Sequence, residues 1–99
     1  MIIVLGSIIA KSGEEDAVKA LSLEHVQRSR TEAGCIAHNV SIDCENPSRF
    51  VFVEEWADMP ALMAHFQLEA SQHFVRDLRA HLAEPPVMKM FDADEVSPS

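Results

Sequence analysis

The sequence contains no tyrosine and only two cysteines among its 99 residues. Without tyrosine, the chain has no phenolic hydroxyl group for acid–base chemistry. Cys35 and Cys44 do not have the Cys-x-x-Cys spacing of a redox motif, and two cysteines are too few for a disulfide framework. We therefore expect no redox catalysis by cysteine, with Cys35 as a small buried residue and Cys44 exposed in a loop.

Positive charge is also scarce. Lys and Arg number 8 against 16 Asp and Glu, which gives a net charge of -8. An acidic surface repels nucleic acid and anionic membranes, so we expect neither as a partner. The opening apolar run Met1–Ala10 is too short to span a bilayer and lacks the basic segment of a secretion signal, which favours a cytoplasmic protein.

Several motifs of catalytic or metal sites are missing. The chain has no Gly-x-Ser-x-Gly sequence and no glycine-rich phosphate loop. His65, His73 and His81 are spaced by eight residues, which turns an ideal helix about 80° past whole turns, so they do not share a helix face. No Cys pair or His-Glu motif has zinc spacing. We expect no metal and, in so short a chain, no cofactor.

Apolar periodicity and turn residues predict the elements of one domain. The expected strands are Ile2–Ala10, Cys35–Ile42, Arg49–Trp56 and Val87–Phe91. One helix should start at a Ser12 cap and run to about Glu32, with Gly34 in a left-handed turn after it. A second should be capped by Asp58, break at Glu69–Ser71, and continue over Gln72–Leu82. The domain covers residues 1–99, with a core over about 2–91 and a polar tail over 92–99.

The order βαββαβ predicts a ferredoxin-like α+β sandwich, in which one antiparallel sheet carries the helices on one face. The first strand is apolar on both faces, and so is the third. An open second face would expose a large apolar surface, so we expect a partner sheet. The simplest partner is a second copy of the chain, in a symmetric homodimer of the dimeric α/β barrel type.

Several segments together resemble one family. They are Glu32-Ala-Gly-Cys-Ile36, the strand Phe50-Val-Phe-Val-Glu-Glu-Trp56, the helix motif Ala61-Leu-Met-Ala-His65, and His73-Phe74. Over about residues 2–91 the chain is similar to the antibiotic biosynthesis monooxygenase family, which includes quinol monooxygenases. The resemblance implies oxidation of a small phenolic or quinol compound by O2 without metal or flavin. Such chemistry needs an apolar pocket, a base and donors for developing negative charge.

The resemblance, with the residue pattern, gives two groups of site residues. The expected catalytic residues are His65 as base or orienting group, His73, and Arg76 as anion stabiliser. The expected substrate-binding residues are Trp56, Phe66, Phe74, His38, His25 and Glu54.

Several of these residues have structural alternatives. His65 also fits a core-edge histidine, Trp56 a core residue, and His25 the rim of the pocket. His38 lies either in the pocket or at the dimer interface. A buried Glu54 needs a partner such as Arg76, His65 or a backbone amide.

Two other functions fit the same residues. An isomerase of a small carbonyl compound, such as a phosphorylated sugar, could also use His65, because both reactions begin with proton abstraction. Convergence of Arg28, Arg30 and Arg76 on the pocket would favour that substrate. A non-catalytic dimer that binds a small ligand is the third possibility, and a solid core beneath the helices would favour it.

Overall fold

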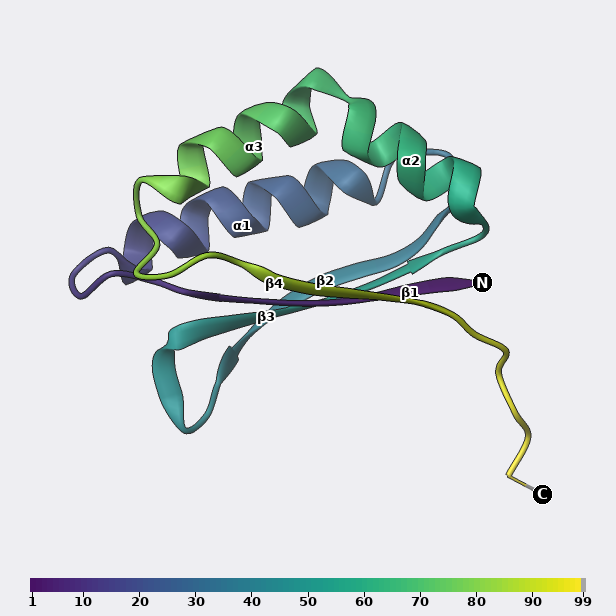
Figure 1. Ribbon diagram of the computed structural model, residues 1–99, viewed down its shortest axis with the longest axis horizontal. Helices are drawn as coiled ribbons and strands as arrows, with labels where there is room; N and C mark the ends of the chain where they lie inside the picture. The colour runs from purple at the N-terminus through teal and green to yellow at the C-terminus, as the bar shows by residue number, and fades with distance from the viewer. Residues whose placement is uncertain (99) are drawn as a thin grey trace.

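The computed structural model describes residues 1–98, which form four strands and three helices (Figure 1). In chain order they are β1 (Ile2–Ile9), α1 (Glu15–Ser29), β2 (Cys35–Asp43), β3 (Asn46–Trp56), α2 (Met59–Gln67), α3 (Glu69–Arg79) and β4 (Val87–Asp92). The sheet is antiparallel, with strand order β2-β3-β1-β4, and the helices all cover one of its faces. The predicted βαββαβ α+β sandwich is confirmed. Within the described residues, no helix has the length and apolar character needed to cross a membrane.

The helix-facing side of the sheet forms the core. Phe50, Phe52, Glu54 and Trp56 of β3 all point to this side and are buried, as their alternation predicts. One core cluster lies at one end of the sheet and comprises Ile8, Ala10, Val18, Val26, Phe50, Phe52, Leu78 and Leu82. A second, smaller cluster comprises Ile2, Val4, Trp56 and Leu62.

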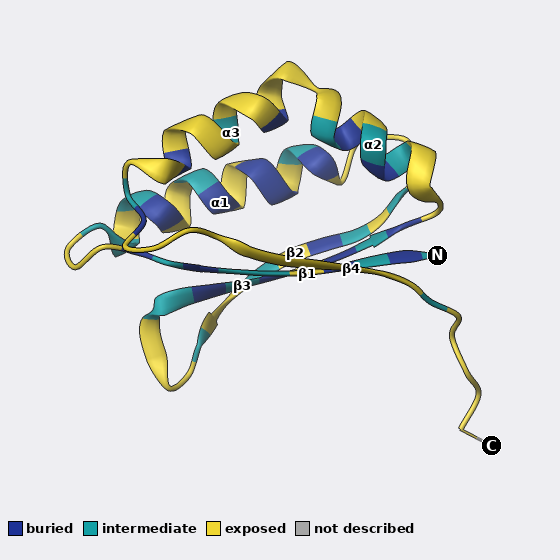
Figure 2. Ribbon diagram, in the orientation of Figure 1, coloured by how far each residue is buried: buried dark blue, intermediate teal, exposed yellow. Residues whose placement is uncertain are grey.

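The opposite face of the sheet is open (Figure 2). In the single chain this face of β1 is uncovered, as the prediction of a partner sheet implies, and Leu5 is 43% exposed. Val53 of β3 and Phe91 of β4 are also exposed, and the strand register places them on the same face as Leu5. An apolar strip therefore crosses three neighbouring strands on the side without helices.

Helix α1 is shorter than predicted at both ends. It begins at Glu15, and Ser12 does not cap it. Gly13 has φ +86°, and its N–H donates to the Glu15 carboxylate at 3.1 Å, so a glycine turn separates Ser12 from the helix. The helix ends at Ser29, which leaves Glu32 in the following turn. Gly34 has φ +83°, as predicted for the residue that leaves this turn.

The second helical region divides at one residue. Asp58 caps α2 as predicted, because its Oδ1 accepts from the N–H of Ala61 at 2.9 Å. The break lies at Leu68 (ψ 135°), and the predicted break at Glu69–Ser71 is wrong. Those residues form the first turn of α3, where the Glu69 carboxylate suits the positive end of the helix dipole.

A β-bulge at the start of β2 changes which side chains face the helices. The register with β3 shifts between Cys35 and Ala37, so Cys35 faces inward while Ile36 is 57% exposed. His38 and Val40 remain on the helix-facing side, opposite Glu54 and Phe52. Strict alternation along Cys35–Ile42 would put Ile36 on the same face as His38, and the bulge overturns that expectation. His38 itself faces the helices and not the open side, so of the two places expected for it the cavity is the one observed.

Candidate functional site

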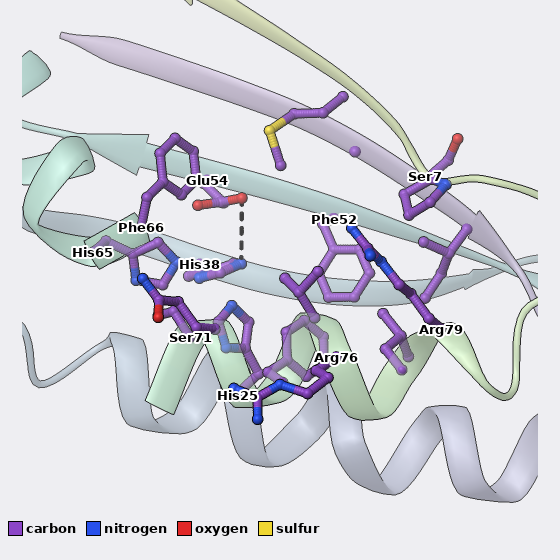
Figure 3. A pocket seen from close by; sticks show the side chains of 18 of the residues that line it. Ser7, His25, His38, Phe52, Glu54, His65, Phe66, Ser71, Arg76 and Arg79 are labelled. Carbon is purple, nitrogen blue, oxygen red and sulfur yellow. Dashed lines mark ion pairs between the residues drawn. The ribbon is translucent and has the colours of Figure 1, made fainter. Parts of the chain in front are cut away.

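A cavity of about 500 Å³ lies between the helices and the sheet. Its apolar wall includes Phe52, Phe66, Phe74, Leu78 and Met88. Its polar residues include His25, His38, Glu54, His65 and Ser71. Figure 3 shows Phe66, His65, His38 and Glu54 at one end, and Ser7 and Arg79 at the other. Ligand pockets commonly combine such apolar walls with a few polar groups, so this cavity is the candidate site.

Three imidazole rings meet at the polar end of the cavity. His25 comes from α1, His38 from β2 and His65 from α2, and each is at most 6% exposed. The ring centroids are 5.1–5.8 Å apart. One nitrogen of each ring lies within 4.8 Å of a nitrogen of the other two. Three elements that are distant in the sequence therefore supply one compact cluster, which we call the histidine cluster.

A carboxylate orients His65. Its Nδ1–H donates to Glu32 Oε1 at 2.8 Å. Because the carboxylate only accepts, the neutral ring keeps its lone pair on Nε2. Glu32 lies in the turn after α1, and Gly34 of that turn accepts from the N–H of Ala57 at 2.8 Å. The turn is thereby tied to the chain that leads into α2, so His65 and its orienting carboxylate are held together.

His38 is held in the same tautomer by a hydroxyl group. Ser29 Oγ donates to the carbonyl of Val26 at 3.1 Å, so it accepts from Nδ1–H of His38 at 2.5 Å. The lone pair of His38 is therefore on Nε2, which lies 3.6 Å from Glu54 Oε2 and accepts no hydrogen bond from residues 1–98 (dashed line in Figure 3). Burial, followed by the charges of His65 and Arg30, lowers the pKa of His38 to about 3.

His25 has the opposite tautomer. Arg28 has only donors, and its Nη2 lies 2.8 Å from His25 Nδ1, so Nδ1 accepts and Nε2 carries the proton. The ring stacks on Phe74 with a centroid distance of 3.9 Å. Burial, followed by the charges of His38, His65 and Arg28, lowers the pKa of His25 to about 3. His25 is thus a neutral donor inside the cavity, not a residue at its rim.

Glu54 is bonded differently from the sequence expectation. Its Oε1 accepts from the indole N–H of Trp56 at 3.0 Å, and its other nearby group is His38. Arg76, His65 and a backbone amide are not its hydrogen-bond partners. Burial raises the pKa of Glu54, and the Trp56 bond and nearby His65 only partly offset this. The carboxyl group therefore holds a proton more readily than an exposed glutamate does.

The structure brings most of the predicted site residues to this cavity. His25, His38, Glu54, His65, Phe66, Phe74 and Arg76 line it. Trp56 does not line it, but lies fully buried behind His65 with a centroid distance of 4.7 Å. His73 does not line it either. Its side chain is 53% exposed, and its Nε2 lies 3.4 Å from Glu69 on the same helix.

The arginine residues divide between the cavity and the fold. Arg28 binds His25, and Arg30 donates to the carbonyl of His38 at 2.9 Å. Arg76 lines the cavity together with Arg79, which the sequence analysis did not select. Among residues 1–98, neither Arg76 nor Arg79 has an ion-pair partner. These two guanidinium groups are therefore free to meet an anionic group at the cavity.

Glu32, Ser29 and Ser71 are among the polar residues around the site that were not predicted from the sequence. Glu32 and Ser29 orient the rings of His65 and His38, although neither lines the cavity. Ser71 lines it, is 4% exposed, and has an Oγ without a partner among residues 1–98. The signal for Glu32 was its place in the family motif, but its partner is 33 residues away, beyond any local spacing rule.

Comparison with known proteins identifies the family. The sequence profile of the family described as "Antibiotic biosynthesis monooxygenase" matches residues 1–77. The chain belongs to this family. It is 32% identical to an antibiotic biosynthesis monooxygenase of known crystal structure, over 96% of this chain and 100% of that one, with a TM-score of 0.88. A protein of Pseudomonas aeruginosa is 26% identical over 95% of this chain and 94% of its own, with a TM-score of 0.86.

A further relative of this chain is an uncharacterised protein of Synechocystis. The two are 33% identical over 94 residues, which is 95% of this chain. This chain spans only 64% of the length of that relative.

Proposed function

We propose that this chain oxidises a small phenolic or quinol compound with O2, without a metal or flavin. The observation that carries the proposal is the Glu32–His65 pair at the end of an apolar, ring-lined cavity. The carboxylate fixes the tautomer that leaves His65 Nε2 free to take a proton, which is the arrangement of an oriented general base. Membership of the antibiotic biosynthesis monooxygenase family supports this chemistry.

The substrate ring lies among Phe52, Phe66 and Phe74. A cavity of about 500 Å³ has room for a compound of one or two fused rings. One hydroxyl group meets His65 Nε2, which removes its proton. The Nε2–H of neutral His25 donates to the resulting oxyanion. His25 does not compete for the proton, because its pKa of about 3 leaves it a poor base at neutral pH.

The electrons for O2 come from the substrate itself. The deprotonated quinol passes one electron to O2, giving a semiquinone radical and superoxide. These combine in a C–O bond on the ring, and the resulting hydroperoxide loses water. A hydroquinone and O2 thus give a hydroxyquinone and H2O, with both oxygen atoms and all four electrons accounted for. The chain contributes a base, an oxyanion donor and an apolar cavity that holds the ring.

Oxygen uptake with 1,4-naphthohydroquinone tests the proposal. The assay uses protein treated with EDTA and is corrected for autoxidation. We expect uptake above background, and a fall of about 100-fold in kcat for His65→Gln, the low end of general-base effects. His81→Gln is the matched control, since that ring bonds Glu14 outside the cavity. Uptake at the background rate, or equal rates for both variants, contradicts the proposal.

A proton-shifting isomerase is the second candidate, favoured by the unpaired Arg76 and Arg79 at the cavity. Two guanidinium groups would bind the phosphate or carboxylate of an anionic carbonyl compound. Arg28 and Arg30 do not join them, since both are engaged with the histidine cluster. Proton exchange into an anionic carbonyl substrate in D2O, with no oxygen uptake, would select the isomerase.

The proposed assembly is a homodimer through the open face of the sheet. Leu5, Val53, Val87 and Phe91 are 40–51% exposed on that face, and a second copy would cover them. Light scattering after size exclusion should give the mass of a dimer for the wild type and of a monomer for Leu5→Glu. Leu23→Glu, on exposed α1 surface, is the control and should remain dimeric. A monomeric wild type, or a dimeric Leu5→Glu, contradicts this assembly.

A further inference from the structure

We infer that the histidine cluster of His25, His38 and His65 binds one divalent transition-metal ion of the zinc type. The three rings are buried, come from three different elements, and bring one nitrogen each within 4.8 Å of the others. Zn–N bonds of about 2.0–2.1 Å require these nitrogens to draw together by on the order of 1 Å. The site opens to the cavity, which leaves a fourth position for water or a ligand.

Two of the three rings already have the tautomer that a metal needs. His65 and His38 direct their Nδ1–H groups to Glu32 and Ser29, so each holds its lone pair on Nε2. Metal-bound histidines usually donate their other N–H to a carboxylate or another oxygen in this way. His38 Nε2 is also buried without a hydrogen-bond partner among residues 1–98. A buried acceptor of this kind is costly unless something occupies it.

The third ring requires one rearrangement. Arg28 now donates to His25 Nδ1, which places the proton on Nε2. The Arg28 side chain is 30% exposed and lies 3.9 Å from the exposed Glu24, so it can turn toward solvent. Nδ1 then takes up a proton and Nε2 loses one to solvent, which frees the lone pair. Arg28 therefore competes with the ion, and its removal should strengthen binding.

The donor set selects the type of ion. Three neutral imidazoles suit zinc, cobalt, nickel and copper, whereas magnesium and calcium prefer oxygen ligands. The carboxylates of Glu32 and Glu54 lie next to the rings of His65 and His38 and offset the charge of the ion. Helical spacing excluded a set made of His65, His73 and His81. The observed set draws on β2 and α1 instead, which no helical spacing reveals.

A bound ion would stop the oxidation proposed above, and this consequence rests on that proposed function. The ion takes the Nε2 lone pair of His65, so this atom can no longer accept a proton from the substrate. The chain free of metal is then the form that oxidises a quinol, and zinc inhibits it with the stoichiometry of one ion per chain.

The binding test uses full-length protein from which EDTA has removed metals, titrated with Zn²⁺ by calorimetry. We expect one Zn²⁺ per chain and no binding of Mg²⁺. Substitution of Co²⁺ for Zn²⁺ should give the intense visible absorption of a four-coordinate ion. These measurements use the wild type and need neither a variant nor a substrate. No Zn²⁺ binding, or a weak six-coordinate Co²⁺ spectrum, overturns the inference.

Variants that lower zinc affinity and one that raises it then test the assignment of the ligands. His25→Gln or His38→Gln should lower zinc affinity by more than the 10–100-fold expected for Glu32→Gln, which removes only an outer partner. Arg28→Met should raise affinity about tenfold, because the ion no longer has to break a charge-assisted hydrogen bond. His81→Gln is the control and should leave affinity unchanged. Circular dichroism checks that each variant is folded. Affinity unchanged in the ligand variants, or lowered in Arg28→Met, contradicts the site.

Different results contradict the metal site and the proposed quinol oxidation. Zinc binding with no oxygen uptake, before or after EDTA treatment, supports the metal site and contradicts the oxidation. Oxygen uptake without zinc binding gives the reverse result. Uptake that increases with added zinc leaves the metal site in place and contradicts the metal-free oxidation.

Discussion

The turn between α1 and β2 offers the sharpest test of how the site is held. Gly34 has φ +83°, and a Cβ added there would lie 2.5 Å from the Cβ of Ala61 in α2. In Gly34→Ala the left-handed backbone costs roughly 1–2 kcal/mol, and the overpacking against α2 costs roughly 1–3 kcal/mol. The alanine also lowers the conformational entropy of the unfolded chain, which stabilises the folded state by about 0.4–1 kcal/mol. The expected net loss of unfolding free energy is therefore about 3 kcal/mol, within a range of roughly 1–5 kcal/mol.

Gly13→Ala is the matched control for the backbone cost alone. Gly13 has φ +86°, but an added Cβ meets nothing within 4 Å. This variant should lose only about 1 kcal/mol. The variant Ala61→Gly removes the contact but itself costs about 1 kcal/mol in the helix. Measured against this single variant, the double variant Gly34→Ala/Ala61→Gly should lose only about as much as Gly13→Ala loses against the wild type. The double-mutant cycle isolates the steric part of the cost.

Urea unfolding followed by circular dichroism measures all of these free energies. Equal losses for Gly34→Ala and Gly13→Ala, or a cost of Gly34→Ala that is the same with and without Ala61→Gly, would refute the close packing of the turn on α2. The same turn carries Glu32, so Gly34→Ala should also lower activity through the Glu32–His65 bond.

Three further predictions concern single residues. Cys44 is exposed, whereas burial, followed by the charges of Glu32 and Glu54, raises the pKa of Cys35, so that little of Cys35 is thiolate at pH 8. A thiol reagent should therefore modify one cysteine quickly in native protein and two in urea. Fast modification of both cysteines in native protein would contradict this. Glu32→Gln should lower kcat for quinol oxidation about tenfold with little change in KM, because the imidazolium loses a charge-assisted bond; an unchanged kcat argues against an orienting role. His38→Leu should keep or raise the urea midpoint, whereas His65→Leu should lose about 1–3 kcal/mol; the opposite order would refute the hydrogen-bond assignment.

Local chemistry made parts of the fold predictable. Alternation along β3 identified the inward face of Phe50 to Trp56, and the Asp58 cap binds an amide only three residues away. The bulge at Ile36 was not predictable, because the strand's own alternation gives no sign of a register shift with β3. The partners of His65 and His38 depend on how α1 lies against β2, which is set by packing over the whole sheet. The sequence thus identified the imidazoles but not their tautomers.

The cost of the histidine cluster indicates that stability does not explain its presence. His38 is buried with an unpaired Nε2, yet each of its neighbours has another partner. Ser29 still donates to Val26 and Glu54 still accepts from Trp56 when the imidazole is gone. A leucine at position 38 would therefore strand no polar group, and well-packed apolar side chains commonly match or exceed buried polar ones in stability. Burying three imidazoles and a carboxyl group where apolar side chains would cost less favours a role for them in the chemistry proposed for the cavity, and the zinc and oxygen measurements test that role.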